Sequence, residues 1–145
     1  MIFIGTDHGG FELKDELVAY IRDELQVSVK DLGIHEKKSA DYPDIASMVC
    51  EHVLKQEGLG IVICGTGIGI SIAANKIKGI RCALCSEEYS ARMSRLHNDA
   101  NVLALGGRTI GPELAKSIVK AFVETVFSNE ERHSNRVCKI SELEK

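Results

Sequence analysis

Short apolar runs rich in β-branched residues recur along the chain and alternate with segments of mixed polarity. Runs of this kind are typical of buried strands when turn-forming residues bound them. On this basis we predict five strands, at residues 2–6, 27–31, 60–64, 80–85 and 102–105.

The segments between and after these strands carry apolar residues at helical spacing. The predicted buried helix faces comprise Leu13, Leu17, Val18, Ile21 and Leu25; Ile45, Met48, Val49 and Val53; and Leu114, Ile118, Phe122 and Val126. Pro43 suits the first turn of the second of these helices, and a further helix is expected from about Gly69. The Ser-Glu-Glu sequence at 86–88 is expected to cap another helix, and a capping-box pattern at 128–131 predicts a short tail helix.

Successive strand–helix units predict an α/β fold. We expect residues 1–145 to form one domain, a three-layer αβα sandwich around a doubly wound, five-stranded parallel sheet. This is the arrangement of Rossmann-like and flavodoxin-like folds. In such sheets ligands bind at the carboxyl ends of the strands, where the strand order reverses.

Composition narrows the class of protein. A chain of 145 residues with 44% hydrophobic and 27% charged residues suits one globular domain. The net charge of −3, with dispersed signs, argues against nucleic-acid binding. No apolar run is long enough to cross a bilayer, and the N-terminus lacks signal-peptide features, so we expect a cytoplasmic protein with no membrane contact. Five cysteines without framework spacing suit reduced thiols.

Polar residues and glycines gather directly after three of the predicted strands. They form the sequences Asp7-His8-Gly9-Gly10, Cys64-Gly65-Thr66-Gly67 and Gly106-Gly107-Arg108. Because the carboxyl ends of parallel strands meet at one edge of the sheet, these three loops are expected to line one site.

The junction at residues 61–71 is the strongest of these signals. A buried strand, a loop with three glycines and a helix start follow one another, so backbone N–H groups and the helix dipole can stabilise an anion. Cys64 stands at the end of the strand as a candidate base or nucleophile, although a free cysteine is more often a small buried hydrophobe. The glycine spacing fits neither a dinucleotide fingerprint nor a P-loop.

Asp7, His8 and His97 are candidate partners of Cys64. Turn formation before two glycines explains Asp7 equally well, whereas His8 has no such structural explanation. His97 follows a predicted helix, where a histidine can also act as a partner of the helix dipole. The expectation is that His97 lies on the same rim as Cys64, with a side chain suited to proton transfer.

Three arginines form a candidate phosphate site. Arg132 and Arg136 share one helical face, which is ordinarily a solvated basic surface, and Arg108 lies in a glycine-bounded loop. If their guanidinium groups converge, they can bind a phosphate bidentately. Cys82 and Cys85 lie three apart in a predicted strand and therefore face opposite sides, which favours a structural role. We find no ligand set for a metal and no site for a redox cofactor.

Several stretches match one known family. They are residues 7–11 with Leu13-Lys14, 41–43, 64–76, 79–81, 94–101, 132–133 and 136–137. Together they resemble the type B ribose-5-phosphate isomerases and the related hexose-phosphate isomerases of the lactose and allose pathways. The resemblance runs from Gly5 to about Ile140, and its central block is far longer than a lone glycine motif.

The resemblance implies reversible isomerisation of ribose 5-phosphate and ribulose 5-phosphate through an enediolate, in the non-oxidative pentose phosphate pathway. It implies that Cys64 moves the proton between C1 and C2, and that Thr66 and His97 open the furanose ring. The oxyanion would be stabilised by N–H groups of the loop, at Gly65, Gly67, Ile68 and Gly69. Asp7 and Asn98 would bind sugar hydroxyls, with Tyr42 lining the pocket. The phosphate ligands implied are His8, Arg108, Arg132 and Arg136.

The resemblance also implies that the reaction needs no cofactor and no metal. By the same resemblance we expect a homodimer, or a tetramer made of two dimers, with the sites at the subunit interface. An isomerase for allose 6-phosphate or galactose 6-phosphate is an alternative. Cys64 and His97-Asn98 in one chain favour the pentose enzyme over the galactose enzymes, whose subunits divide these residues. A non-catalytic sugar-phosphate binding module and a thiol redox protein using Cys82 and Cys85 are further alternatives.

Overall fold

A twisted parallel sheet forms the centre of the computed structural model, which describes residues 1–33 and 40–144. The strand order is β2-β1-β3-β5-β4, and every neighbouring pair is parallel. The strands are β1 (Ile2–Thr6), β2 (Val29–Asp31), β3 (Leu59–Cys64), β4 (Cys82–Leu84) and β5 (Val102–Gly106). The order reverses between β1 and β3, so the sheet is doubly wound and the predicted fold class is confirmed.

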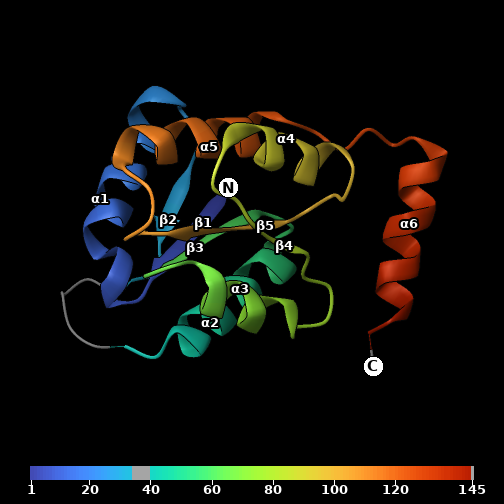
Figure 1. Cartoon of the computed structure of the whole chain (residues 1–145), viewed down its shortest axis with the longest axis horizontal. Coiled ribbons are helices and arrows are strands. Elements are labelled where there is room, and N and C mark those ends of the chain that lie inside the picture. The colour runs from blue at the N-terminus through green and yellow to red at the C-terminus, as the bar shows by residue number, and fades with distance from the viewer. Residues whose placement is uncertain (34–39, 145) are drawn as a thin grey trace.

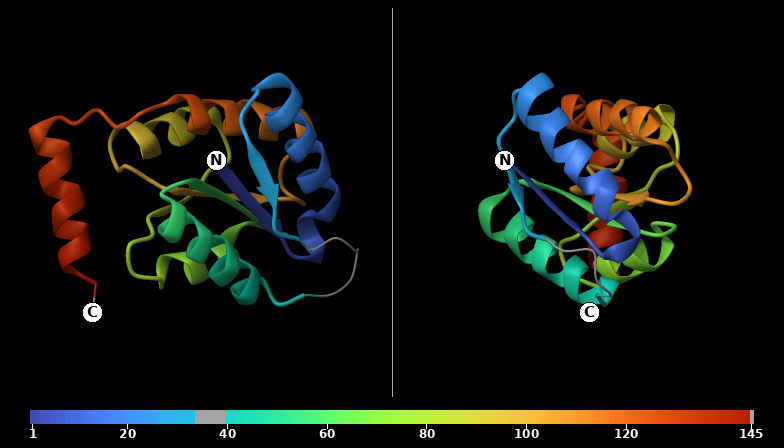
Figure 2. Two further views of the ribbon diagram at one scale, coloured as in Figure 1. Left: turned by 180° about the vertical axis from the view of Figure 1, so that it is seen from behind. Right: turned by 90° about the vertical axis from the view of Figure 1, so that its left-hand side faces the viewer.

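Helices cover both faces of the sheet (Figure 1). One face carries α1 (Phe11–Ala19), α4 (Glu88–Leu96) and α5 (Pro112–Glu124), and the other carries α2 (Tyr42–Gln56) and α3 (Ile68–Asn75). A 3₁₀ turn, η1 (His8–Gly10), precedes α1, and a π-helical turn, η2 (Tyr20–Glu24), follows it. The last helix, α6 (Glu131–Glu142), stands apart from this sandwich in Figure 1 and in the left-hand view of Figure 2.

The core is divided by the sheet into two apolar clusters. The cluster under α1, α4 and α5 is built around Ile63, Leu105 and Phe122, and the cluster under α2 and α3 around Val49 and Val62. The strands β1 and β5 are buried along their whole length, as expected for the middle of a sheet covered on both faces. Among the described residues, no helix combines the length and apolarity needed to cross a membrane.

The two edge strands are shorter than predicted. The N–H of Val27 donates to the Ile21 carbonyl, and the N–H of Ile80 donates to the Ile77 carbonyl, so both residues belong to turns. An edge strand has a pairing partner on one side only, and its ends are therefore more readily captured by local turns.

Two predictions about the C-terminal region are wrong. The helix α5 ends at Glu124, and Val126 is 74% exposed instead of extending the buried face. The capping box at 128–131 does not form, because the N-cap is Glu130 and the Ser128 hydroxyl accepts from the Glu130 N–H and pairs with His133 Nδ1. The tail helix is consequently held at its start by a buried histidine.

Cys82 and Cys85 lie on opposite faces of the sheet, as predicted. Cys85 belongs to the cluster under α1, α4 and α5, whereas Cys82 packs against the other cluster. Burial raises the pKa of Cys85 to about 11, and it also raises the pKa of Cys82. This placement opposes a disulfide between the two thiols.

Replacement of Gly10 by alanine is expected to destabilise the fold by about 1–3 kcal/mol. A Cβ at Gly10 would lie 2.2 Å from Ile63 Cγ2 and 2.5 Å from Thr6 Oγ1, inside a core with no space to give. The control is Gly111→Ser, whose Cβ would meet nothing within 4 Å at the N-cap of α5, a position that serine favours, so stability should not fall. Urea unfolding followed by circular dichroism measures both; equal stabilities of the two variants would contradict the packing argument.

The buried thiols are expected to resist modification. Burial raises the pKa of Cys50 to about 12, so at pH 8 this thiol and those of Cys82 and Cys85 have almost no thiolate. Iodoacetamide should label the exposed Cys138 of the folded protein and spare these three, and urea should make all of them reactive. Peptide mass spectrometry reads the result. A Cys82–Cys85 disulfide formed by diamide in the folded protein would revive the redox alternative.

Candidate active site

The carboxyl ends of β1 and β3 meet at the point where the strand order reverses. Thr6 stands opposite Ile63 in the ladder, which places Asp7 beside Cys64. A hollow of about 470 Å³ opens here between Asp7, His8 and Tyr42. A second hollow of about 230 Å³ is also lined by His8 and reaches Arg108. This is where an open α/β sheet binds its ligand.

Asp7 is held by the backbone on both sides. Its N–H donates to the Ile63 carbonyl at 3.1 Å, and its Oδ1 accepts from the Gly9 N–H at 2.8 Å. The Thr6 hydroxyl lies 3.1 Å from the Ile63 carbonyl and 2.8 Å from the Asp7 carbonyl, and thus ties the two strand ends together. Asp7 therefore does cap the turn η1, and the same contacts fix its buried carboxyl group at the edge of the crevice.

Cys64 is 5% exposed at the end of β3. The N–H of Gly67 points at its sulfur, with a donor–acceptor distance of 3.2 Å. Gly67 has a φ of +80°, and a Cβ there would lie 2.5 Å from Leu84 Cδ1, so only glycine places this N–H without strain. The loop thus turns back over the thiol before α3 begins.

The start of α3 supplies further donors. The Ile68 N–H is 3.2 Å from the Thr66 hydroxyl, and the N–H groups of a first helical turn have no partner within the helix. Their dipoles add to a positive potential at this end of α3. The geometry matches an oxyanion site, in which N–H groups face a charge that develops beside a base.

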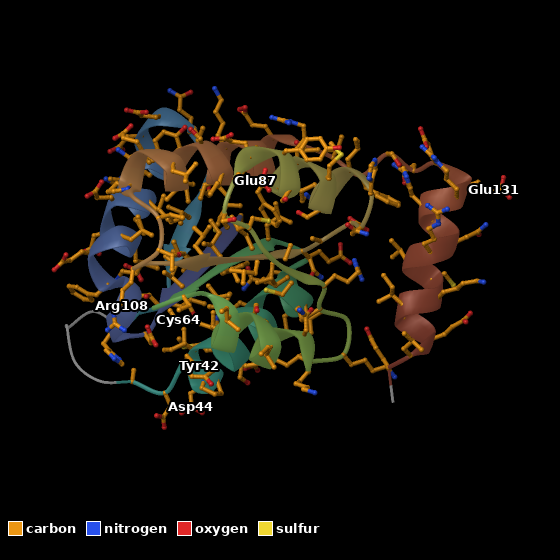
Figure 3. The ribbon with its side chains drawn as sticks, in the orientation of Figure 1. Tyr42, Asp44, Cys64, Glu87, Arg108 and Glu131 are labelled. Carbon is orange, nitrogen blue, oxygen red and sulfur yellow. The ribbon has the colours of Figure 1, made fainter. Side chains whose placement is uncertain are left out.

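Tyr42 and Arg108 close the site from two sides. A Cβ on Gly69 would lie 2.6 Å from the Tyr42 ring, and one on Gly65 would lie 2.9 Å from Arg108 Nη1, so both side chains cover the glycine loop. The Arg108 N–H also donates to the Gly65 carbonyl at 2.9 Å. Figure 3 shows Tyr42, Cys64 and Arg108 gathered at the same end of the sheet. We refer to this group, with Asp7 and His8, as the thiol end.

The other predicted site residues lie at the opposite end of the strands, near their amino ends. His97 and Asn98 follow α4, directly before β5 begins at Val102, and β5 must run its five residues to reach the thiol end. At about 3.3 Å per residue this is roughly 16 Å. The expectation that His97 shares a rim with Cys64 is wrong within one chain, because a crossover helix returns the chain to the amino ends of the strands.

Arg132 and Arg136 lie on α6, beyond that same opposite edge (Figures 1 and 3). They are exposed and do not converge with Arg108 of their own chain. Arg132 pairs with the carboxylate of Glu130, at 3.0 Å from Nε to Oε2. We refer to His97, Asn98, Arg132 and Arg136 as the histidine end.

Two arginines hold the backbone at the histidine end through hydrogen bonds, and neither was predicted as a site residue. Arg81 Nε donates to the Asp99 carbonyl at 2.9 Å, and Arg95 donates to the carbonyls of Ala100 and Thr125. Burial lowers the pKa of Arg95, partly offset by the charge of Asp99. Asp99 itself has a φ of +48°, so the chain turns tightly just after His97 and Asn98.

His133 is another residue that the sequence argument missed. It is 5% exposed, and its ring centroid lies 4.3 Å from that of His97. A signal was available, because His133, Val137 and Ile140 are spaced by four and three residues and therefore share one face of a helix.

Comparison with known proteins identifies relatives over almost the whole chain. Residues 2–140 match the family model described as Ribose/Galactose Isomerase. The ribose-5-phosphate isomerase B of Escherichia coli is 51% identical over 144 residues, which is 99% of this chain and 95% of that protein. A putative sugar phosphate isomerase of Bacillus subtilis is 48% identical over 145 residues, covering 99% of this chain and 96% of the relative.

A solved structure agrees with these sequence matches. The ribose-5-phosphate isomerase B of Clostridium thermocellum superimposes with a TM-score of 0.94 at 51% identity, over 98% of this chain and 95% of that one. The match covers the sheet, the glycine loop after β3 and the segments that carry the histidine end. The chain belongs to the ribose/galactose isomerase family.

Proposed function

We propose that this chain catalyses the reversible isomerisation of ribose 5-phosphate and ribulose 5-phosphate, as a step of the non-oxidative pentose phosphate pathway. The observation that carries the proposal is the Cys64 thiol beside the N–H donors of the glycine loop, at the point where the sheet order reverses. Relatives named ribose-5-phosphate isomerase B, at 51% identity over nearly the whole chain, support the substrate.

In the proposed reaction the Cys64 thiolate takes the proton from C2 of the open-chain aldose and returns it to C1, while the hydroxyl proton of O2 passes to O1. The intermediate is an enediolate, whose oxygen faces the N–H groups of Gly65, Gly67, Ile68 and Gly69. The 3.2 Å contact from the Gly67 N–H becomes charge-assisted when the sulfur is deprotonated. The proton shuttle is internal to the substrate and base, and this chemistry uses neither a metal nor a nucleotide cofactor.

The remaining site residues are assigned roles that suit their chemistry. Asp7 and Asn98 bind sugar hydroxyls, and Tyr42 lines the pocket beside the glycine loop. Thr66 and His97 act in opening the furanose ring, with His97 exchanging the proton of the ring oxygen. The phosphate is bound by His8, Arg108, Arg132 and Arg136, whose guanidinium groups suit bidentate contacts.

These roles require two copies of the chain. The thiol end and the histidine end lie on opposite edges of one sheet, so a complete site needs the histidine end of a second copy. In a two-fold symmetric dimer each contact is made twice, so the thiol end of each subunit meets the histidine end of the other. We propose a homodimer whose sites combine the thiol end of one subunit with the histidine end of its partner; pairing of dimers into a tetramer stays a prediction.

The surface next to α6 supports this dimer. A groove of about 710 Å³ lies between α6 and the body of the same chain; its mixed lining includes the apolar side chains of Ile80, Ile140 and Leu143 together with Asn98. On the outside of α3, Ile68 and Ile72 are 52% and 55% exposed. Apolar side chains of this size on an exposed helix indicate a surface that a partner covers.

A cytoplasmic location is part of the same proposal. The five cysteines are free thiols in the structure, which suits a reducing compartment. The sugar phosphates of the proposed pathway are intracellular metabolites.

Cys64→Ala is expected to abolish isomerisation and to leave sugar-phosphate binding intact. Removing a general base costs roughly 10²–10⁴-fold in kcat, whereas the groups that hold the substrate are untouched. Turnover is measured with ribose 5-phosphate and binding by calorimetry, with Cys138→Ala on the exposed thiol as the control. Full activity of Cys64→Ala would sink the base assignment, and turnover of allose 6-phosphate alone by the wild type would move the substrate to the hexose class.

Mixing two inactive variants tests the shared site. Cys64→Ala and His97→Ala homodimers each lack one half of both sites, whereas a mixed dimer has one site with Cys64 and His97 of the partner subunit intact. After denaturation and joint refolding, random pairing should restore about a quarter of the wild-type activity. If the refolded mixture gains nothing although mass spectrometry detects mixed dimers, the two residues act within one chain.

A further inference from the structure

His133 is a buried imidazole without a role in the proposed reaction. It is the buried residue of α6, whose other side chains are exposed or half-buried. Its ring lies against that of His97, with centroids 4.3 Å apart and planes inclined by 35°. One side of the proposed acid–base group is therefore covered by a side chain of α6.

The Nδ1 atom of the His133 ring is held by Ser128. The hydroxyl lies 2.7 Å from His133 Nδ1, and it already accepts from the Glu130 N–H at 3.2 Å. Donation of the hydroxyl hydrogen to Nδ1 uses both polar functions of Ser128, and this assignment places the proton of a neutral His133 on Nε2. The Ser128 N–H in turn donates to the Leu96 carbonyl at 3.0 Å, which ties this segment to the end of α4.

The surroundings of His133 keep it neutral. Burial lowers its pKa, as do the neighbouring His97 and the two arginines of α6, while Glu130 at 3.7 Å acts in the opposite direction. These groups are the charged or titratable side chains that act on His133 from the end of α4, the connecting segment and α6. Because the His133 ring is neutral, it can stack on the His97 ring without placing a charge beside it, whether or not His97 carries a proton from the substrate.

We propose that His133 is a positioning residue that holds the His97 ring in the orientation needed to reach a sugar bound at the thiol end of the partner subunit. The inference rests on the proposed function, because it gives His97 its task. An imidazole on an otherwise exposed helix end samples several rotamers, and the stacked ring removes that freedom before the substrate binds. His133 acts through His97 and makes no contact with the reacting atoms itself.

Three variants separate this role from simple packing. His133→Leu fills the space without a ring to stack, and we expect kcat for ribose 5-phosphate to fall roughly 10- to 100-fold, as misplaced catalytic groups do. His133→Phe keeps a stacking ring and should recover most of that loss. Val137→Ala removes a half-buried side chain one turn further along α6 and should leave kcat unchanged. KM and inhibition by inorganic phosphate should stay at wild-type values throughout.

A phosphate-binding role or a mere anchoring role for His133 gives the opposite pattern. In either case KM for ribose 5-phosphate and the inhibition constant of inorganic phosphate would rise in both His133 variants, as expected for Arg136→Ala, while kcat held. That result, or an unchanged kcat in His133→Leu, would overturn the inference.

A measurement without substrate keeps the test separate from the proposed function. In ¹H–¹³C spectra the His97 imidazole signals, identified with His97→Asn, should carry a ring-current shift that His133→Leu removes and His133→Phe retains. Absence of that shift in the wild type would refute the positioning role. Wild-type protein that shows the shift but does not isomerise ribose 5-phosphate would refute the proposed function alone.

Discussion

The parallel pairing of β1 with β3 is the interaction on which the candidate site depends. In this register the Ile63 carbonyl accepts from the Asp7 N–H and lies within reach of the Thr6 hydroxyl. A carboxyl group and a thiol from segments far apart in the sequence are thereby fixed at one crevice. A slip of one residue would turn the side chains of a whole strand to the other face of the sheet, and Asp7 would no longer stand beside Cys64.

The direction of the chain imposes the second constraint. Every strand of a parallel sheet ends at the same edge, and every crossover helix brings the chain back to the other edge. Residues in the loops after strands can therefore gather around Cys64, whereas those after α4 and on α6 cannot. The fold of one chain therefore separates the thiol end from the histidine end, which is why the proposed site combines these ends from two subunits.

The sequence was sufficient for the central elements and the thiol end. The runs that became β1, β3 and β5 are apolar enough to be buried on both faces, so neither turns nor edges compete with them. The edge strands, with one pairing partner each, lost residues to neighbouring turns. The prediction that Val126 extends the buried face of α5 was wrong. Arg95 donates to the Thr125 carbonyl directly after the end of α5, and helical spacing does not encode such a tertiary contact.

For the candidate site, residue type was a better guide than the assumed location. His97 was selected for its chemistry and then placed beside Cys64, although the direction of its own helix already put it at the opposite edge. His133 was not predicted as a site residue because α6 is rich in charged residues, which obscure the helix face on which His133 is buried. Both outcomes depend on how elements are oriented in space, which composition and motif spacing do not describe.

The carboxylate of Glu144 gives α6 a second attachment. Its two oxygens accept from the N–H of Gly79, at 3.1 and 3.0 Å, in the turn before β4. The Ser128 N–H donates to the Leu96 carbonyl just before α6 begins, so hydrogen bonds fix α6 to the body of the chain near both of its ends, across the groove. The position of Arg132 and Arg136 on α6 consequently depends on the turn at Gly79 as well as on α4. In the proposed dimer, a change in that turn would therefore alter phosphate binding although Gly79 belongs to neither half of the site.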